Sequence, residues 1–392
     1  MHKERQVKHT TYEFLAHKVQ EYERYRGNQT HQLRFTLALT AVCLIFVSCH
    51  AMVGNLSQPL PQPKRGTISE NEIWSGVIKV DDDVIVPSGV SLKILPGTTV
   101  IFASKDLDKN KLKLIIHGGM TAEGTIRQPI KFQSDYKHPL QTEGWWRNST
   151  WQGIIISSAD SSPTHVIRHC IIDNAYVGID MKDAQVIVTE SRIRRVEHAS
   201  IECARGKLEL TETELVNGQF GVHGSSTVLI ARKNSIRDHQ FGIGGSYVHA
   251  SISENTFYGN AGGIDIQALT NEIEISHNEF HRCGDGITLG VHDVSVLIER
   301  NEFKEGSHKN VLFRGRGTAR LKKNRSRYGA YGIYVEGEPN NRVTVVGSIN
   351  DSSDPDTNTM RYMRDGNVYP YDYVLQRNGL SGLTRIKNEK NP

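Results

Sequence analysis

Four side chains that can move protons or hold a cation occur at one position of a repeated pattern. They are Asp180, Glu202, His223 and Asp265, and each directly follows an Ile or Val. Carboxylates beside an imidazole are suited to general acid and base catalysis, and carboxylate oxygens are ligands that Ca²⁺ prefers. Like charges on neighbouring strands repel, so stability alone does not favour Asp180 beside Glu202. The two interpretations are a site that acts on a sugar chain and a solvated face with screened charges.

Aromatic residues form a second group of candidates. Phe220, Phe241 and Tyr331 precede the same position in their repeats, and Tyr334 occupies that position itself. An aromatic ring offers a flat apolar face on which a sugar ring can stack, so these four residues are candidate carbohydrate contacts. Their alternative role is to cover the apolar core.

Both groups depend on a repeat of 21 to 23 residues between about Thr164 and Val335. Before each marker residue the side chains alternate between apolar and polar, and a Gly-Ile or Gly-Val step follows about eight residues later. The clearest markers are Asn234, Asn255, Asn278, Asn301 and Asn324. A fixed period of this length indicates stacked units that bury their apolar faces against neighbours. Alternation in twos predicts short strands, and the repeats show no helical period.

Each repeat is therefore predicted to form one coil of two or three short strands. Successive coils would stack as parallel strands about 4.8 Å apart. The marker amides, which have donors and an acceptor, would form a structural ladder inside the stack. The glycines would lie at tight corners, where φ is positive or backbones come close. The predicted fold class is all-β, a right-handed single-stranded parallel β-helix, or solenoid.

The first coils also resemble a known family. The segments VIVPSGVSLKILPGTTVIF, GTIRQPIKF and WQGIII are similar to bacterial right-handed parallel β-helix proteins, the pectate-lyase-like superfamily. The resemblance covers about residues 67 to 349. It implies the fold and leaves the activity open, because this superfamily contains lyases, hydrolases, epimerases and adhesins. Ca²⁺ would be implied only if the protein were a lyase; otherwise no cofactor is expected.

The enzyme motifs of these relatives are largely missing. Of the polygalacturonase-like motifs only Arg385-Ile386-Lys387 occurs, outside the coils and without its partners. The Asp-Pro motif of mannuronan epimerases is absent from the repeats. The sequence therefore favours a protein that is not an enzyme, without excluding a lyase or epimerase.

The ends of the chain differ from the repeats. Residues 1–34 form a basic leader, and 35–54 are apolar, either a transmembrane segment or a lipoprotein signal with Cys49 as the lipidated residue. Residues 55–66 are a Pro-rich linker, 67–350 the β-helix, and 351–392 a cap and tail. Either anchor would place the β-helix outside the cytoplasm, attached to a membrane.

Charge and cysteine content limit the partners. The net charge of +4 comes from the amino-terminal part, so the repeats are near neutral and no nucleic-acid partner is expected. The basic cluster from Arg314 to Arg327 is interpreted as a solvated rim, with an anionic polysaccharide or lipid headgroup as the alternative. Cys170, Cys203 and Cys283 point inward and are predicted to be buried free thiols.

No metal site is predicted. The spacing of His277, His281 and Cys283 looks suitable, but alternation turns Cys283 inward and His277 outward. The sequence carries no signal for an oligomeric state.

The sequence leaves three functions open. The preferred one is an envelope-anchored β-helix that serves as a binding or structural module, with polysaccharide as the partner. The second is a lyase or epimerase acting on uronic-acid polymers through Asp180, Glu202, His223 and Asp265. The third is an adhesin or assembly scaffold.

Overall fold

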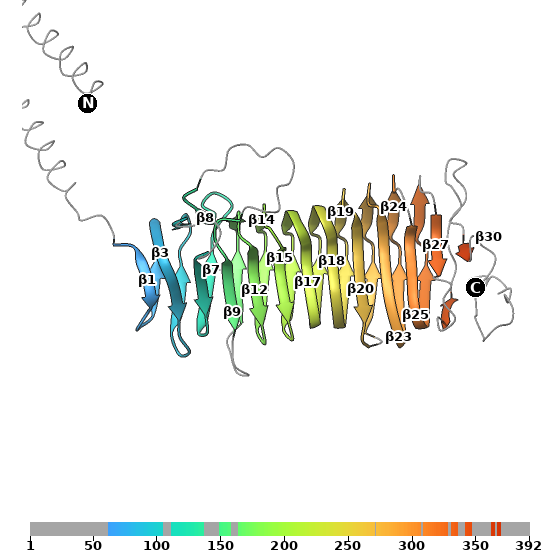
Figure 1. The fold of residues 1–392 in the computed structure, drawn as a ribbon, viewed down its shortest axis with the longest axis horizontal. Coiled ribbons are helices and arrows are strands. Elements are labelled where there is room, and N and C mark those ends of the chain that lie inside the picture. Colours follow the sequence, from blue (N-terminus) through green and yellow to red (C-terminus); the bar gives the residue numbers. More distant parts are fainter. Residues whose placement is uncertain are drawn as a thin grey trace, which may run out of the picture. The chain divides into compact units, whose positions relative to one another are not determined.

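The structure is a computed structural model, and it describes residues 62–104, 111–136, 149–157, 164–270, 272–306, 309–327, 331–335, 342–346, 362–364 and 367–369. All of them belong to the unit Pro61–Pro392. The regular elements in these ranges are strands, which follow one another in coils stacked along one axis (Figure 1). They form a right-handed parallel β-helix of about ten turns.

The first coils contain β1 (Lys64–Thr67), β2 (Glu72–Trp74), β3 (Val77–Val86), β4 (Ser91–Ile94), β5 (Thr99–Phe102), β6 (Lys113–Ile116), β7 (Gly119–Glu123), β8 (Ile130–Ser134) and β9 (Gly153–Ser157). The middle coils contain β10 (His165–Arg168), β11 (Cys170–Asp173), β12 (Val177–Lys182), β13 (Gln185–Thr189), β14 (Arg192–Arg194), β15 (Ala199–Ala204), β16 (Lys207–Thr211), β17 (Glu214–Arg232), β18 (Ser235–Ser253), β19 (Thr256–Tyr258) and β20 (Gly262–Ala268). The last coils contain β21 (Ile273–Ser276), β22 (Glu279–His281), β23 (Asp285–Glu299), β24 (Glu302–Lys304), β25 (Lys309–Lys322), β26 (Arg325–Arg327), β27 (Tyr331–Val335), β28 (Arg342–Val346), β29 (Tyr362–Arg364) and β30 (Asn367–Tyr369).

Each strand pairs in parallel with the strand one coil further on. β10, β11 and β12 pair with β13, β14 and β15, and these pair with β16 and two parts of β17. Among the described strands, β29 and β30 alone pair antiparallel. The predicted parallel β-helix is thus confirmed. The first strand begins at Lys64, inside the expected linker, whereas the predicted anchor 35–54 and Cys49 lie outside the described residues.

The marker asparagines form a continuous ladder inside the stack. Asn234 Nδ2 donates to Asn255 Oδ1 at 2.9 Å, and the same bond recurs from each asparagine to the next as far as Asn324. Each of these oxygens also accepts the backbone N–H of the preceding marker. Hydroxyls continue the pattern in earlier coils, where Thr213 Oγ1 accepts the N–H of Ser191.

Apolar side chains fill the rest of the interior. Phe257, Phe280 and Phe303 stack with ring centroids 4.8 and 4.9 Å apart, one ring per coil. Cys170, Cys203 and Cys283 are buried and unpaired, which confirms the prediction of buried free thiols. Because every coil repeats the same interior, the outer face is a regular support on which equivalent residues align.

The glycines of the Gly-Ile step were expected either to adopt positive φ at tight corners or to allow backbones to come close. The described glycines of this step do not adopt positive φ. Positive φ instead belongs to the residue directly before each marker, such as His277 (φ 56°) and Arg300 (φ 53°). The glycines are needed where backbones come close, since a Cβ at Gly263 would lie 2.6 Å from the carbonyl oxygen of Gly286.

Candidate functional site

The four candidate acid and base residues lie in one column across adjacent coils. Asp180 in β12 pairs with Glu202 in β15, and Glu202 pairs with His223 in β17. His223 pairs with Gly244 in β18, and Gly244 pairs with Asp265 in β20. The register therefore brings the first three into contact range and separates them from Asp265 by one glycine.

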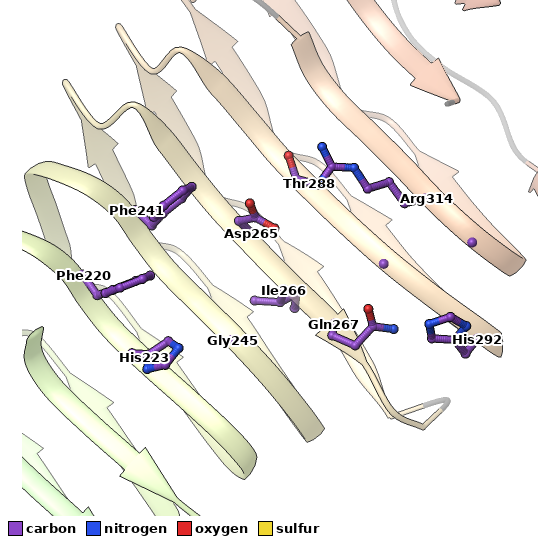
Figure 2. A pocket seen from close by; sticks show the side chains of 12 residues that line it. Phe220, His223, Phe241, Gly245, Asp265, Ile266, Gln267, Thr288, His292 and Arg314 are labelled. Carbon is purple, nitrogen blue, oxygen red and sulfur yellow. The ribbon is translucent and has the colours of Figure 1, made fainter. Parts of the chain in front are cut away.

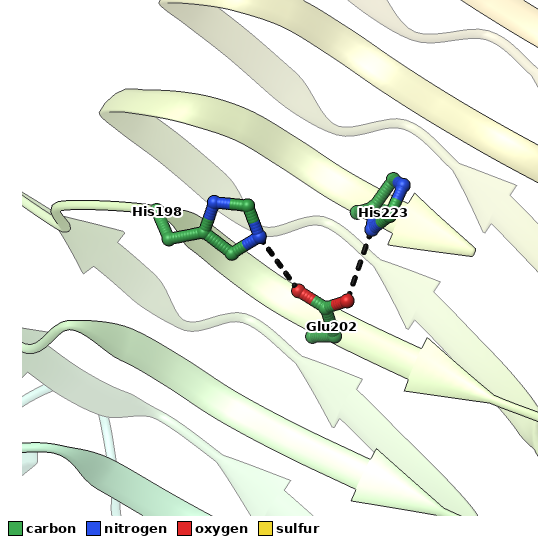
Figure 3. A group of neighbouring side chains, drawn as sticks. All are labelled: His198, Glu202 and His223. Atoms are coloured by element: carbon green, nitrogen blue, oxygen red, sulfur yellow. Dashed lines mark hydrogen bonds and ion pairs between the residues drawn. The ribbon is translucent and has the colours of Figure 1, made fainter. Parts of the chain in front are cut away.

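Glu202 joins two histidines (Figure 3). Its carboxylate lies 3.0 Å from His198 Nε2 and, through the other oxygen, 3.0 Å from His223 Nδ1. His198 precedes β15, and its Nδ1 lies 2.9 Å from Gln219 Oε1. An imidazole that donates to both oxygens carries a proton on each nitrogen, so this geometry favours the imidazolium form of His198.

The charges of this cluster support one another. Hydrogen bonds from His198 and then His223 lower the pKa of Glu202 to about 2. The hydrogen bond to Glu202 raises the pKa of His198, against an opposing effect of burial. The neighbouring Asp180 behaves in the opposite way, because burial and then the charge of Glu202 raise its pKa. The column thus holds one firmly ionised carboxylate beside one that is protonated more readily than usual.

Aromatic rings lie beside this cluster. Phe220 and Phe241 stack with centroids 5.4 Å apart and planes 20° apart, and the His223 ring lies 4.6 Å from Phe220. The stack ends at Gly262, which pairs with Phe241 in the next coil and has no side chain to continue it. A Cβ there would meet Phe241 Cδ1 at 2.9 Å. The face of the Phe241 ring on that side is therefore not covered by the paired residue.

A hollow of about 600 Å³ opens on the outer face at this point (Figure 2). We call it the outer hollow. It is bordered by Phe220, His223 and Phe241 at one side and by polar side chains from β20, β23 and β25 at the other. These polar residues are Asp265, Gln267, Thr288, His292 and Arg314.

The polar side of the outer hollow combines both charges. Figure 2 shows the Arg314 side chain extended toward Thr288. Burial raises the pKa of Asp265. The positive charge of Arg314 opposes this rise, and the negative charge of Asp285 adds to it. The side-chain amide of Gln267 lies over Gly290, where an added Cβ would clash with the Oε1 atom of Gln267. The Nε2 atom of Gln267 is buried and has no hydrogen-bond partner among the described residues.

The sequence candidates separate into three groups. Phe220, Phe241, His223 and Asp265 border the outer hollow, whereas Asp180 and Glu202 are not among its lining residues. Tyr331 and Tyr334 belong to β27, and their side chains lie outside the described part.

Two residues of the site, His198 and Gln267, were missed from sequence, and Arg314 was named only as part of the basic cluster. His198 stands four residues before Glu202, but it lies in the turn before β15, where strand alternation does not set the direction of a side chain. Gln267 and Arg314 each lie two residues beyond the aligned column, also on the same face. The period of two was therefore a usable signal for Gln267 and Arg314 but not for His198.

His198, Glu202 and His223 are also potential metal ligands, although no metal site was predicted. One ligand atom from each lies within 4.8 Å of the others.

Among the described residues, no helix is both long and apolar enough to span a bilayer.

The comparison with family models agrees with the fold. Residues 220–354 match a family model described as right handed beta helix region. Structures of the periplasmic alginate epimerase AlgG are similar at 14% identity; one mutant form has a TM-score of 0.40 over 74% of this chain and 68% of that chain. Tailspike protein 2 of bacteriophage CBA120 is similar through its enzymatically active domain, with 11% identity, a TM-score of 0.23, and coverage of 72% and 43%. No curated protein matches the sequence.

Proposed function

We propose that this protein is an extracytoplasmic β-helix that binds polysaccharide in the outer hollow. The observation that carries this proposal is the Phe241 ring, which ends an aromatic stack and borders the hollow, and whose register partner Gly262 has no side chain to cover it. We also propose that the protein is attached to a membrane, either by residues 35–54 as a transmembrane segment or by a lipid on Cys49.

The hollow offers the two kinds of contact that a sugar requires. The ring face of Phe241 can cover the apolar side of a pyranose, and the opposite wall carries hydrogen-bonding groups. Gln267 supplies an amide donor that a sugar hydroxyl can satisfy after a rotation of the side chain, while Arg314 supplies a cation for an acidic substituent. Asp265 borders the same hollow, and its carboxyl group can accept a hydrogen bond from a sugar hydroxyl.

The shape of the support also suits a polymer. Strands of successive coils repeat about every 4.8 Å, so a chain lying along the axis would meet equivalent positions of several coils. The polar and aromatic residues come from β17, β18, β20, β23 and β25, which are consecutive coils. A site distributed in this way binds an oligosaccharide better than a single sugar.

Binding should be measured by calorimetry with neutral and uronate oligosaccharides on the wild-type chain and on Phe241→Ala. We expect the affinity to fall at least tenfold, about 1.4 kcal/mol, since the stacking platform is lost. Tyr258→Ala is the matched control, because Tyr258 is an exposed aromatic residue that does not border the hollow. Equal binding by Phe241→Ala and wild type, or no binding of any oligosaccharide, would reject the proposal.

A lyase or epimerase is the second candidate. One observation supports it: His223 and Asp265 both border the outer hollow, two coils or about 10 Å apart, so a sugar between them could meet a base and an acid. The absorbance of unsaturated uronates reports the lyase, and proton exchange at the sugar carbon that bears the acid reports the epimerase. His223→Gln should abolish either signal; polymers that stay unchanged with wild type would remove this candidate.

A further inference from the structure

Two adjacent coils bring three potential metal ligands together. Glu202 and His223 are register partners in β15 and β17, so their backbones lie one strand spacing apart. His198 reaches the same point from the turn before β15, where its N–H donates to Tyr176 O and its own carbonyl accepts the N–H of Phe220. Backbone hydrogen bonds to both neighbouring coils thus hold the base of this side chain.

The donor set indicates the kind of ion. Two imidazole nitrogens and one carboxylate are typical of catalytic zinc sites and of other late first-row divalent metals, with water in the remaining position. Ca²⁺ prefers six to eight oxygen ligands, which this cluster does not supply. The side chains of His198, Glu202 and His223 are 27, 29 and 32% exposed, so an ion and its water ligands can reach them.

The surroundings of the cluster fit the same interpretation. Gln219 Oε1 accepts a hydrogen bond from His198 Nδ1, which leaves Nε2 turned toward Glu202. Metal-bound histidines commonly have such a partner on the other ring nitrogen, because it fixes the orientation of the ring. The Phe220 ring packs against both imidazoles, with centroids 5.5 and 4.6 Å away, and limits their movement.

We propose that His198 Nε2, Glu202 and His223 Nδ1 bind one divalent transition-metal ion, with Zn²⁺ as the best fit. On binding, the two histidine–glutamate hydrogen bonds are replaced by three ligand bonds, and the shared protons leave to solvent. The proposal does not depend on polysaccharide binding. Other histidine–glutamate pairs, such as His281 with Glu279, have a single imidazole near the carboxylate and are not part of such a group in the described residues.

The test uses the untagged full chain and Zn²⁺ alone. Equilibrium dialysis followed by elemental analysis should give one Zn²⁺ per chain, and Co²⁺ substitution should give visible absorption bands of a site with nitrogen ligands. His198→Gln and His223→Gln should each weaken binding more than tenfold, and Gln219→Ala should weaken it about tenfold by releasing the His198 ring. His281→Gln, the matched control, should bind like wild type.

Circular dichroism separates loss of a ligand from loss of the fold. If one variant unfolds, the Co²⁺ spectrum of the wild-type chain and the other histidine variant still decide the question. The proposal is overturned if wild type binds no Zn²⁺ stoichiometrically, if both folded histidine variants retain its affinity, or if His281→Gln loses affinity to the same extent.

Discussion

Asn255 Nδ2 and the Asn255 backbone N–H both donate to Asn278 Oδ1, at 3.0 and 2.9 Å. One buried oxygen therefore satisfies two donors of the preceding coil. The Asn278 amide in turn donates to Ile252 O at 2.8 Å and to Asn301 Oδ1 at 3.0 Å. A single side chain thus connects three coils.

Asn278→Ala should destabilise the β-helix strongly. Removing the amide leaves the two Asn255 donors without their acceptor, and each unsatisfied buried group costs about 1–3 kcal/mol. We expect a loss of about 3 kcal/mol or more in the free energy of unfolding, measured by urea denaturation. Asn278→Thr should cost less, because Thr213 shows that a hydroxyl in this slot accepts the N–H of the preceding coil.

Gln185→Ala is the control for this series, since Gln185 is an exposed amide at the start of β13. It should change the free energy of unfolding by less than about 0.5 kcal/mol. A ladder variant no less stable than Gln185→Ala would show that the buried amides contribute little.

Stability should depend on pH through Glu202 and His198. The folded pKa of Glu202, about 2, is below its unfolded value of about 4.3, so its contribution is complete above pH 4.3 and is lost as the pH falls toward 2. The folded pKa of His198 is raised, so its contribution is complete below about pH 6.5 and is lost as the pH rises through the folded value. The pair therefore stabilises most between about pH 4.3 and 6.5.

Melting temperatures of wild type and Glu202→Gln, measured at pH values below, inside and above this window, test the expectation. The difference between them should be largest inside the window and shrink on both sides. Glu209→Gln, which removes a carboxylate that pairs with an exposed lysine on β16, should give a difference with no such maximum. Parallel pH profiles for all three proteins would contradict the assignment.

The fold and the aligned column were predictable because a solenoid converts sequence period into position. Once each repeat forms one coil, residues one repeat apart must pair, and Asp180, Glu202, His223 and Asp265 follow from the apolar residue before each of them. The same logic gave the marker column of Asn255 and Asn278.

The contacts across this column were not predictable in the same way. His198 lies in a turn, where its direction depends on local backbone hydrogen bonds to Tyr176 and Phe220 and not on alternation. The sequence interpretation placed glycines at the tight corners, because positive φ is uncommon in other residues. In the structure, charged residues such as Arg300 adopt positive φ at these corners. Gly262 and Gly290 leave room for the side chains of Phe241 and Gln267, which belong to neighbouring coils. The repeat period alone does not reveal such contacts.

Gly262→Ala should weaken polysaccharide binding while the fold is kept. Its φ is not in the left-handed region, so the backbone tolerates a side chain, but the new Cβ would meet Phe241 Cδ1 at 2.9 Å. The ring must shift and its open face is partly covered, which should reduce the affinity about three- to tenfold, or about 0.7–1.4 kcal/mol. Calorimetry with the best-bound oligosaccharide measures the change. Gly306→Ala, away from the hollow, should leave the affinity unchanged; an unaltered affinity in Gly262→Ala would argue against stacking on Phe241.

The three described thiols should be inert in the folded protein. Burial raises the pKa of Cys170 to about 12 and the pKa values of Cys203 and Cys283 to about 11, so almost no thiolate exists at mildly alkaline pH. Iodoacetamide labelling followed by peptide mass spectrometry should find these three cysteines unmodified in the native chain and fully modified in guanidinium chloride. A cysteine introduced at exposed Gln185 should react in both conditions, which shows that the reagent is active. Rapid native labelling of Cys203, which lies in β15 next to Glu202, would mean that the coil carrying the proposed metal ligands opens in solution.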